Sequence, residues 1–120
     1  MFNLRGELRK EEFKFELLER TRHINERLYR LRKNIKLNKL NESVYKIYVV
    51  DRGEGKGLEI HLLCYDATVI VVSYEDHKLI TILNEGIGRL KKRYGNEKYP
   101  KYLYECALRN SEKSKQSMVK

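Results

Sequence analysis

The chain has 120 residues, 41% of them hydrophobic, which suits one domain with a buried core and leaves little room for two. Its 26 Lys and Arg residues outnumber 17 Asp and Glu residues, for a formal net charge of +9. No segment approaches the ~20 uninterrupted apolar residues of a membrane-spanning helix. The N-terminal residues carry charges where a secretory signal peptide has its apolar stretch. We therefore expect a cytoplasmic protein without a membrane segment.

The charge is distributed unevenly along the chain. Residues 1–42 hold 12 Lys/Arg and 7 Asp/Glu, residues 43–88 hold 4 and 7, and residues 89–120 hold 10 and 3. Basic ends around a mildly acidic middle raise a local positive potential that attracts polyanions. This pattern predicts a nucleic-acid partner, with RNA expected first. Solubility and a Lys- and Tyr-rich genomic bias are the alternative explanation.

Residues 8–36 are predicted to form one long helix, or two in line. Their apolar residues recur at spacings of three and four and so form one stripe. No Gly or Pro interrupts the chain between Gly6 and Gly53. The stripe consists of Leu17, Ile24, Leu28, Leu31 and Ile35.

From Val44 the hydrophobic period changes to two, which predicts strands. Short connections between the strands favour an antiparallel meander packed against the N-terminal helix, hence an α+β fold. The GEGKG segment at 53–57 joins two of these strands and is expected to be a hairpin turn rather than a phosphate cradle. The four predicted strands are 44–52, 58–65, 68–74 and 79–84.

The C-terminal part is predicted to be helical and then disordered. Residues 89–94 form a basic helix, and Pro100 suits the first turn of a short helix that reaches Arg109. The polar residues that follow are expected to be disordered. The predicted organisation is one domain over 1–110 and a disordered basic tail over 111–120.

Several kinds of site are not predicted. Cys64 and Cys106 lie in apolar runs 42 positions apart, which predicts reduced core residues. His61 and His77 are expected at the surface, and the three histidines are dispersed. No metal or cofactor is expected.

A basic stripe lies beside the apolar stripe of the predicted helix. Arg20, His23, Arg27, Arg30 and Asn34 share it at about 100° per residue. Arginine suits phosphate recognition because its planar fork donates two parallel hydrogen bonds. A neutral His23 among arginines suits a general base. From this region we expect Arg20, Arg30 and Lys33 to bind nucleic acid; a solvated basic face with an incidental histidine is the alternative.

Tyrosines near the C-terminus are interleaved with cations. Such an arrangement suits single-stranded RNA, whose bases stack on rings while its phosphates pair with cations. The alternative is a helix that packs its tyrosines on the sheet. The nucleic-acid-binding residues expected here are Arg89, Lys92, Arg93 and Tyr94.

Two segments resemble parts of a known protein family: ERTRHINERLYRLR (19–32) and VIVVSYEDHKLITIL (69–83). The chain resembles the small ribonuclease toxins of the barnase–EndoU–colicin–RelE fold, in particular the colicin-D-like group. The resemblance implies metal-independent RNA cleavage through attack of the 2′-hydroxyl. It also implies an acidic antitoxin or immunity protein as a partner. The implied catalytic residues are His23 as the helix histidine, Arg27 on the phosphate and Thr81 as the strand hydroxyl.

Three functions remain open on the sequence. The first is a metal-independent endoribonuclease of toxin type. The second is a non-catalytic nucleic-acid-binding protein of a phage or plasmid. The third is a basic protein-interaction or inhibitor module with an acidic partner. Convergence of His23, Arg27 and Thr81 around a basic cleft would favour the first, and their separation on opposite faces of the sheet would favour the other two.

Overall fold

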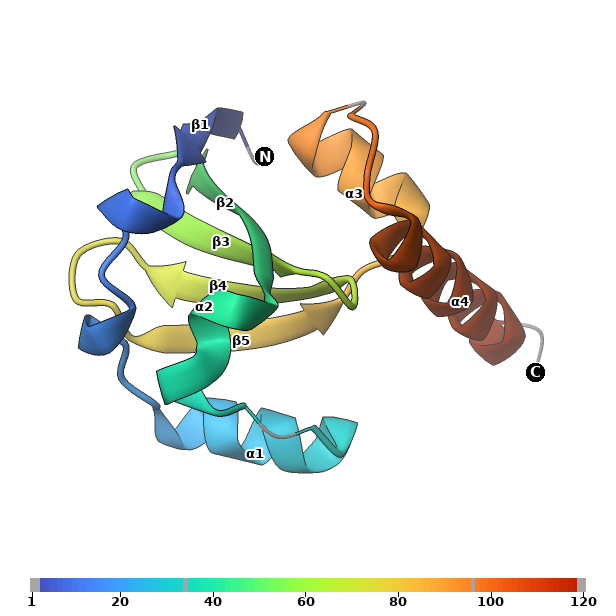
Figure 1. The fold of residues 1–120 in the computed structure, drawn as a ribbon, viewed down its shortest axis with the longest axis horizontal. Coiled ribbons are helices and arrows are strands. Elements are labelled where there is room, and N and C mark those ends of the chain that lie inside the picture. The colour runs from blue at the N-terminus through green and yellow to red at the C-terminus, as the bar shows by residue number, and fades with distance from the viewer. Residues whose placement is uncertain (1–2, 34, 96, 119–120) are drawn as a thin grey trace.

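The computed structural model describes residues 3–33, 35–95 and 97–118, with side chains up to residue 112. The fold is α+β, as the sequence predicts. Five antiparallel strands form one sheet in the order β1-β2-β3-β4-β5, so each strand pairs with its neighbour in the chain (Figure 1). The strands are β1 (Asn3–Leu8), β2 (Val44–Asp51), β3 (Leu58–Cys64), β4 (Thr68–Ser73) and β5 (Leu79–Asn84).

Four of these strands, β2 to β5, lie where the hydrophobic alternation predicts them. The first strand is an addition to the predicted four-stranded meander. β1 pairs with β2 at one edge of the sheet, and most of its residues are exposed. A strand at the edge of a sheet whose side chains are mostly exposed does not need to alternate apolar and polar residues. The sequence of β1 therefore lacks the alternation by which a strand is predicted.

Four helices and three short 3₁₀ turns connect and cover the sheet. The helices are α1 (Arg22–Leu31), α2 (Leu40–Ser43), α3 (Ile87–Tyr94) and α4 (Lys101–Met118). The 3₁₀ turns are Lys10–Glu12, Phe15–Leu17 and Leu37–Lys39.

The prediction of one long helix over 8–36 is wrong. The Thr21 hydroxyl caps α1 by accepting a hydrogen bond from the backbone N–H of Ile24 over 3.2 Å. Arg32 ends α1 in the left-handed region with φ of 52°. A straight helix over 8–36 would be about 43 Å long, longer than the greatest extent of the molecule, 39 Å. The bent chain instead buries Phe13 and Leu18 in the same core as α1.

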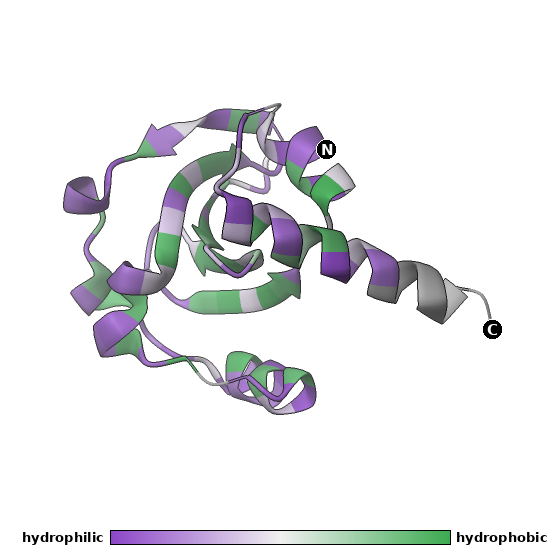
Figure 2. Cartoon of the chain, turned by 45° about the vertical axis from the view of Figure 1, so that its right-hand side comes forward, coloured by the Kyte–Doolittle hydropathy of each residue, from purple (hydrophilic) through white to green (hydrophobic). Residues whose placement is uncertain are grey.

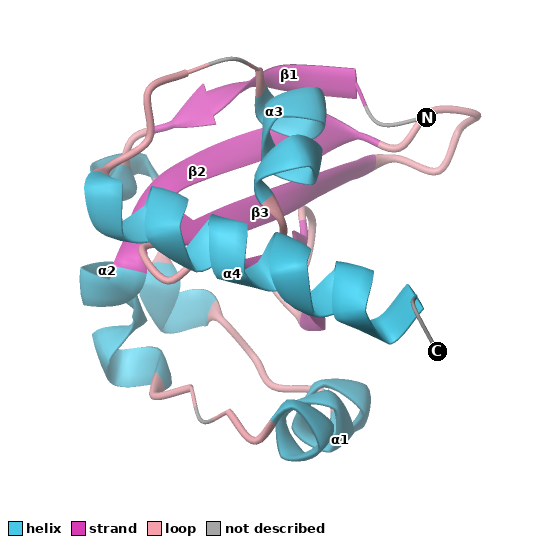
Figure 3. Cartoon of the chain, turned by 90° about the vertical axis from the view of Figure 1, so that its right-hand side faces the viewer, coloured by secondary structure: helices cyan, strands magenta, loops and turns pink. Residues whose placement is uncertain are grey.

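Both faces of the sheet are covered, and each has its own apolar core. On one face Ile24 and Leu28 of α1 and Leu40 of α2 pack against the strands. On the other face Leu90 of α3 and Leu103 of α4 do so. Figure 2 shows the hydrophobic colour running along the central strands, and Figure 3 shows α3 and α4 lying across one face. Burial on both sides explains the unbroken apolar run of β4.

The segment before α1 pairs with the start of β5 at the outer edge of the sheet. The N–H of Glu19 donates to the carbonyl of His77 over 3.0 Å, and the N–H of Leu79 donates to the carbonyl of Glu19 over 2.9 Å. The Thr21 hydroxyl donates to the carbonyl of Leu79 over 2.9 Å. These bonds satisfy backbone groups that an open edge strand would leave unpaired. They also fix α1 beside β5.

The C-terminal helix is longer than predicted. α4 continues to Met118, through most of the segment expected to be a disordered tail. Its far end projects beyond the sheet (Figure 1). Within the described ranges, no helix has both the length and the apolar character needed to cross a bilayer.

Candidate nucleic-acid interface

The three implied catalytic residues do not share one face of the sheet. His23 lies exposed in the first turn of α1, and Arg27 donates from Nε to the carbonyl of Ile82 over 3.2 Å. Thr81 pairs with Val71 of β4, whose side chain belongs to the core beneath α3 and α4. Paired residues of antiparallel strands point to the same face. Thr81 therefore points away from the face that α1 covers.

Some of the basic side chains in and just before α1 make a hydrogen bond within the fold. Arg20 is exposed, yet its guanidinium donates to the carbonyl of Ile35 and so ties the chain after α1 back to its beginning. Arg30 is exposed to solvent. Part of the predicted basic stripe thus serves the fold, and Asn34, which also belongs to that stripe, lies outside the described residues.

The residues expected from α3 also divide. Arg89 and Lys92 are exposed. Arg93 lies 3.1 Å from the buried carboxylate of Glu85. Tyr94 is only 4% exposed, so its ring lies in the core and offers no face to a base. For Tyr94 the alternative explanation is therefore correct: the helix packs this tyrosine on the sheet.

Tyr94 belongs to a buried polar group that joins α3 to the sheet. Its hydroxyl lies 2.7 Å from Nδ1 of His61, and its ring stacks on Tyr48 with centroids 4.4 Å apart. Glu59 Oε1 lies 3.3 Å from Nε2 of His61. Burial lowers the pKa of His61, although Glu59 acts in the opposite direction. The surface position expected for His61 is wrong, because α3 covers that side of β3.

The structure forms a pocket of about 600 Å³ at the end of the sheet where β3 turns into β4. We call it the Lys33 pocket. The chain after α1, the β3–β4 turn and the start of α4 form its walls. Its volume lies within the range of about 300–1,000 Å³ that is typical of small-molecule sites.

The floor of the Lys33 pocket is apolar. Leu40, Cys64 and Ile70 belong both to the pocket and to the core beneath α1 and α2. Burial raises the pKa of the Cys64 thiol to about 12, so the thiol stays protonated near neutral pH. Cys64 is therefore an apolar floor residue rather than a nucleophile.

Three lysines and two tyrosines line the same pocket. Lys36 and Lys39 are exposed, and Lys33 lies deeper. Tyr65 and Tyr102 are 40% and 57% exposed. Lys10 Nζ lies 5.9 Å from the centroid of the Tyr65 ring, so Tyr102 offers the more open ring surface to a ligand. Glu42 and Asp66 also line the pocket, so the lysines outnumber the acids.

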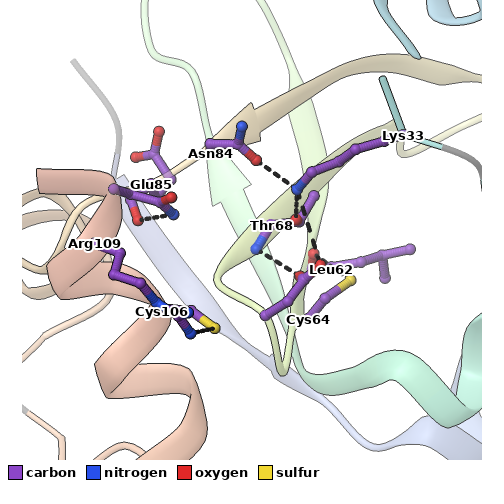
Figure 4. A network of polar contacts seen from close by, with 10 residues as sticks. Lys33, Leu62, Cys64, Thr68, Asn84, Glu85, Cys106 and Arg109 are labelled. Atoms are coloured by element: carbon purple, nitrogen blue, oxygen red, sulfur yellow. Dashed lines mark hydrogen bonds and ion pairs between the residues drawn. The ribbon is translucent and has the colours of Figure 1, made fainter. Parts of the chain in front are cut away.

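Lys33 anchors the pocket rather than reaching into solvent. Its Nζ contacts the hydroxyl of Thr68, donates to Oδ1 of Asn84 over 2.6 Å and lies 3.9 Å from the carboxylate of Asp66 (Figure 4). The ammonium thus has hydrogen-bond acceptors in β4 and β5, and a carboxylate of the turn before β4 lies within ion-pair distance. These contacts hold the chain after α1 against the sheet. The nucleic-acid-binding role expected for Lys33 stays a prediction.

The sequence contains a signal for this pocket that the helix prediction concealed. Lys33, Lys36 and Lys39 recur at a spacing of three, across the end of the helix predicted over 8–36. In the structure they lie on the irregular chain and 3₁₀ turn between α1 and α2. Lys39 ends this 3₁₀ turn, and Lys36 precedes it as the N-cap residue. Their spatial neighbours Tyr65 and Thr68 come from a distant hairpin, which no local pattern indicates.

Among the residues that the structure describes, no group of three or more His, Cys, Asp or Glu is arranged to hold a metal ion. Comparisons of this chain with models of known protein families, with curated proteins and with solved structures find no match.

Proposed function

We propose that this protein binds single-stranded RNA through the Lys33 pocket, without cleaving it. One observation carries the proposal: an apolar floor, three lysines and two exposed tyrosine rings line a single pocket of about 600 Å³. Each component has a counterpart in a nucleotide. Phosphates pair with the lysines, and a base stacks on a tyrosine ring.

Lys36 and Lys39 supply the cations for this role. Both are exposed and make no ion pair among the residues that the structure describes, so no internal bond is broken when a phosphate approaches. An ammonium is a compact point charge on a flexible stem, which tolerates variation in the ligand backbone. Such contacts favour binding with little dependence on sequence.

Binding without catalysis is favoured by the placement of the implied catalytic residues. A metal-independent ribonuclease needs a base, a cation on the phosphorane and an acid around one phosphate. Thr81 points to the opposite face of the sheet from α1. RNA cleavage is the second candidate. It rests on the resemblance and on His23 and Arg27, which lie one turn apart on α1.

Fluorescence anisotropy with a labelled single-stranded RNA tests the proposal. The RNA should have about ten nucleotides, within the site sizes of ~4–16 nucleotides found for single-strand binders. The double variant K36A/K39A should lower the affinity. It should also reduce the slope of log affinity against log salt by about 1.4, since each phosphate contact on a single strand contributes ~0.7.

The double variant K56A/K78A is the matched control. It removes the same charge from the turns at the opposite end of β3 and β4, and both lysines are exposed. Equal losses in the two variants would mean that net charge alone attracts RNA, and the Lys33 pocket would lose its role. No RNA affinity of the wild type at low salt would reject the proposal and leave an acidic protein partner.

Incubation of the wild type with RNA in EDTA separates binding from cleavage. The proposal expects intact RNA. Products that end in a 2′,3′-cyclic phosphate, lost in His23→Ala by ~10²–10⁴-fold, would establish cleavage with His23 as the base.

A further inference from the structure

A second basic pocket lies on the other side of the first turn of α4. It has a volume of about 410 Å³ and is lined by Lys91, Lys98, Lys101, Tyr99, Tyr104 and Glu97. We call it the Lys91 pocket. It repeats the composition of the Lys33 pocket: three lysines, with tyrosine rings between them.

The only acid that lines the Lys91 pocket among the described residues is already paired. One carboxylate oxygen of Glu97 accepts a hydrogen bond from Lys46 over 2.7 Å, and the other accepts one from the Tyr48 hydroxyl over 2.9 Å. The bond to Glu97 raises the pKa of Lys46, so this ion pair is intact at neutral pH. Glu97 therefore fixes the wall of the pocket to β2, while its charge is offset by Lys46.

The lysines of this pocket and one tyrosine remain available. Lys91, Lys98 and Lys101 are exposed, and no described residue forms an ion pair with them. The Tyr104 ring is 40% exposed. Tyr99 is buried, and its hydroxyl donates to the carbonyl of Leu90 over 3.4 Å, so it forms the floor.

The start of α4 separates the two pockets. Tyr102 lines the Lys33 pocket and Tyr104 lines the Lys91 pocket. Residues two apart on a helix differ by about 200° in direction, so the two rings leave α4 on opposite sides. A helix with its side chains is about 10–12 Å across, a span that a few nucleotides of an extended strand can bridge. Figure 3 shows α4 running across the face of the sheet with α3 beside it.

We propose that the two pockets form one track, on which a single-stranded polynucleotide crosses the first turn of α4 and occupies both pockets at once. This inference rests on the proposed function. A short fragment fills one pocket only, because the helix stands between them. A longer strand links the two binding events, and such linkage raises affinity by ~10²–10⁴-fold without any new kind of contact.

The length dependence of binding by the full chain tests the track. A uridine dinucleotide, titrated by NMR, should bind weakly, and an oligouridine of about ten nucleotides should bind ~10²–10⁴-fold more tightly. The double variant K91A/K98A should abolish most of this gain and leave dinucleotide binding at the Lys33 pocket unchanged. The variant K36A/K39A should weaken both ligands.

Three outcomes would overturn the track. The first is that K91A/K98A binds the longer RNA as tightly as the wild type does. The proposal that RNA binds at the Lys33 pocket would survive this result. The second is equal affinity of the wild type for short and long oligouridine. The third is displacement of the RNA by poly-glutamate at equal charge concentration, which would assign both pockets to an acidic protein. Tyr104→Ala provides a second variant, since it removes a ring of the Lys91 pocket without changing charge. Absence of all RNA affinity in the wild type would instead reject the proposed function itself.

Discussion

Lys33 donates a hydrogen bond from Nζ to Oδ1 of Asn84 over 2.6 Å, which joins the chain after α1 to the last residue of β5. The same ammonium contacts Thr68 at the start of β4. One side chain thus connects three segments that lie far apart in the sequence. Lys33, Lys36 and Lys39 line the same pocket, so this contact ties the segment that carries the three lysines to the sheet.

The variant Lys33→Met tests this anchor. Methionine keeps the length of the side chain and removes its charge and donors. We expect a loss of about 1 kcal/mol in the free energy of unfolding, since Lys33 is partly solvated and its acceptors can bind water. Urea denaturation measures the change, with Lys36→Met as the control at an exposed site of the same segment. An unchanged urea midpoint in Lys33→Met would show that the contacts of Lys33 do not stabilise the fold.

Tyr94 should matter for stability and not for RNA binding. Tyr94→Phe keeps the ring that stacks on Tyr48 and removes the hydroxyl that meets His61. It should cost about 1–2 kcal/mol because a buried partner loses its hydrogen bond. Tyr94→Ala should cost about 3–5 kcal/mol because it also leaves a cavity. The RNA affinity of Tyr94→Phe, measured by anisotropy, should equal that of the wild type. A loss of affinity would show that Tyr94 takes part in RNA binding.

Tyr102 should show the opposite behaviour. Its ring is 57% exposed in the Lys33 pocket. Tyr102→Ala should lower RNA affinity by ~5–150-fold, because stacking of one base on an aromatic ring contributes about 1–3 kcal/mol. The thermal midpoint should stay close to that of the wild type. Tyr29→Ala is the matched control, because Tyr29 is 86% exposed on α1 and lines neither pocket. Equal losses of affinity in the two variants would contradict a specific stacking role.

Stability should fall as the solution becomes acidic. The pKa of His61 is lowered from its usual 6.5 by burial, while Arg93 adds to this effect and Glu59 opposes it. The unfolded chain therefore takes up a proton at His61 at a higher pH than the folded chain does. The contribution of His61 is complete above about pH 6.5 and is lost as the pH falls through the folded-state pKa.

Thermal midpoints measured between about pH 5 and 8 test this dependence. The wild type should lose stability over the acidic half of the range. His61→Gln, which retains a polar side chain that does not titrate, should have a flatter profile. A profile of the same slope in both proteins would assign the pH dependence to other groups.

Sequence alone determined the central meander. The strands β2 to β5 are recognisable because alternation, apolar runs and turn residues are local signals, and each strand pairs with its neighbour in the chain. The excess of basic residues at the two ends was equally apparent. The hairpin turn at GEGKG also follows from the sequence, because glycine readily adopts positive φ. In the structure Gly55 and Gly57 have φ of 71° and 88°.

Tertiary structure decided the rest. Leu17, part of the predicted apolar stripe, is exposed, whereas Phe13 and Leu18 are buried, because the chain before α1 bends to reach the core instead of continuing as a helix. His61 is buried because the second layer of helices covers the side of β3 that alternation marks as polar. The Lys33 pocket depends on contacts between the chain after α1, the β3–β4 turn and α4. Such long-range packing cannot be recognised from a local pattern, because the residues that line the pocket come from segments far apart in the sequence.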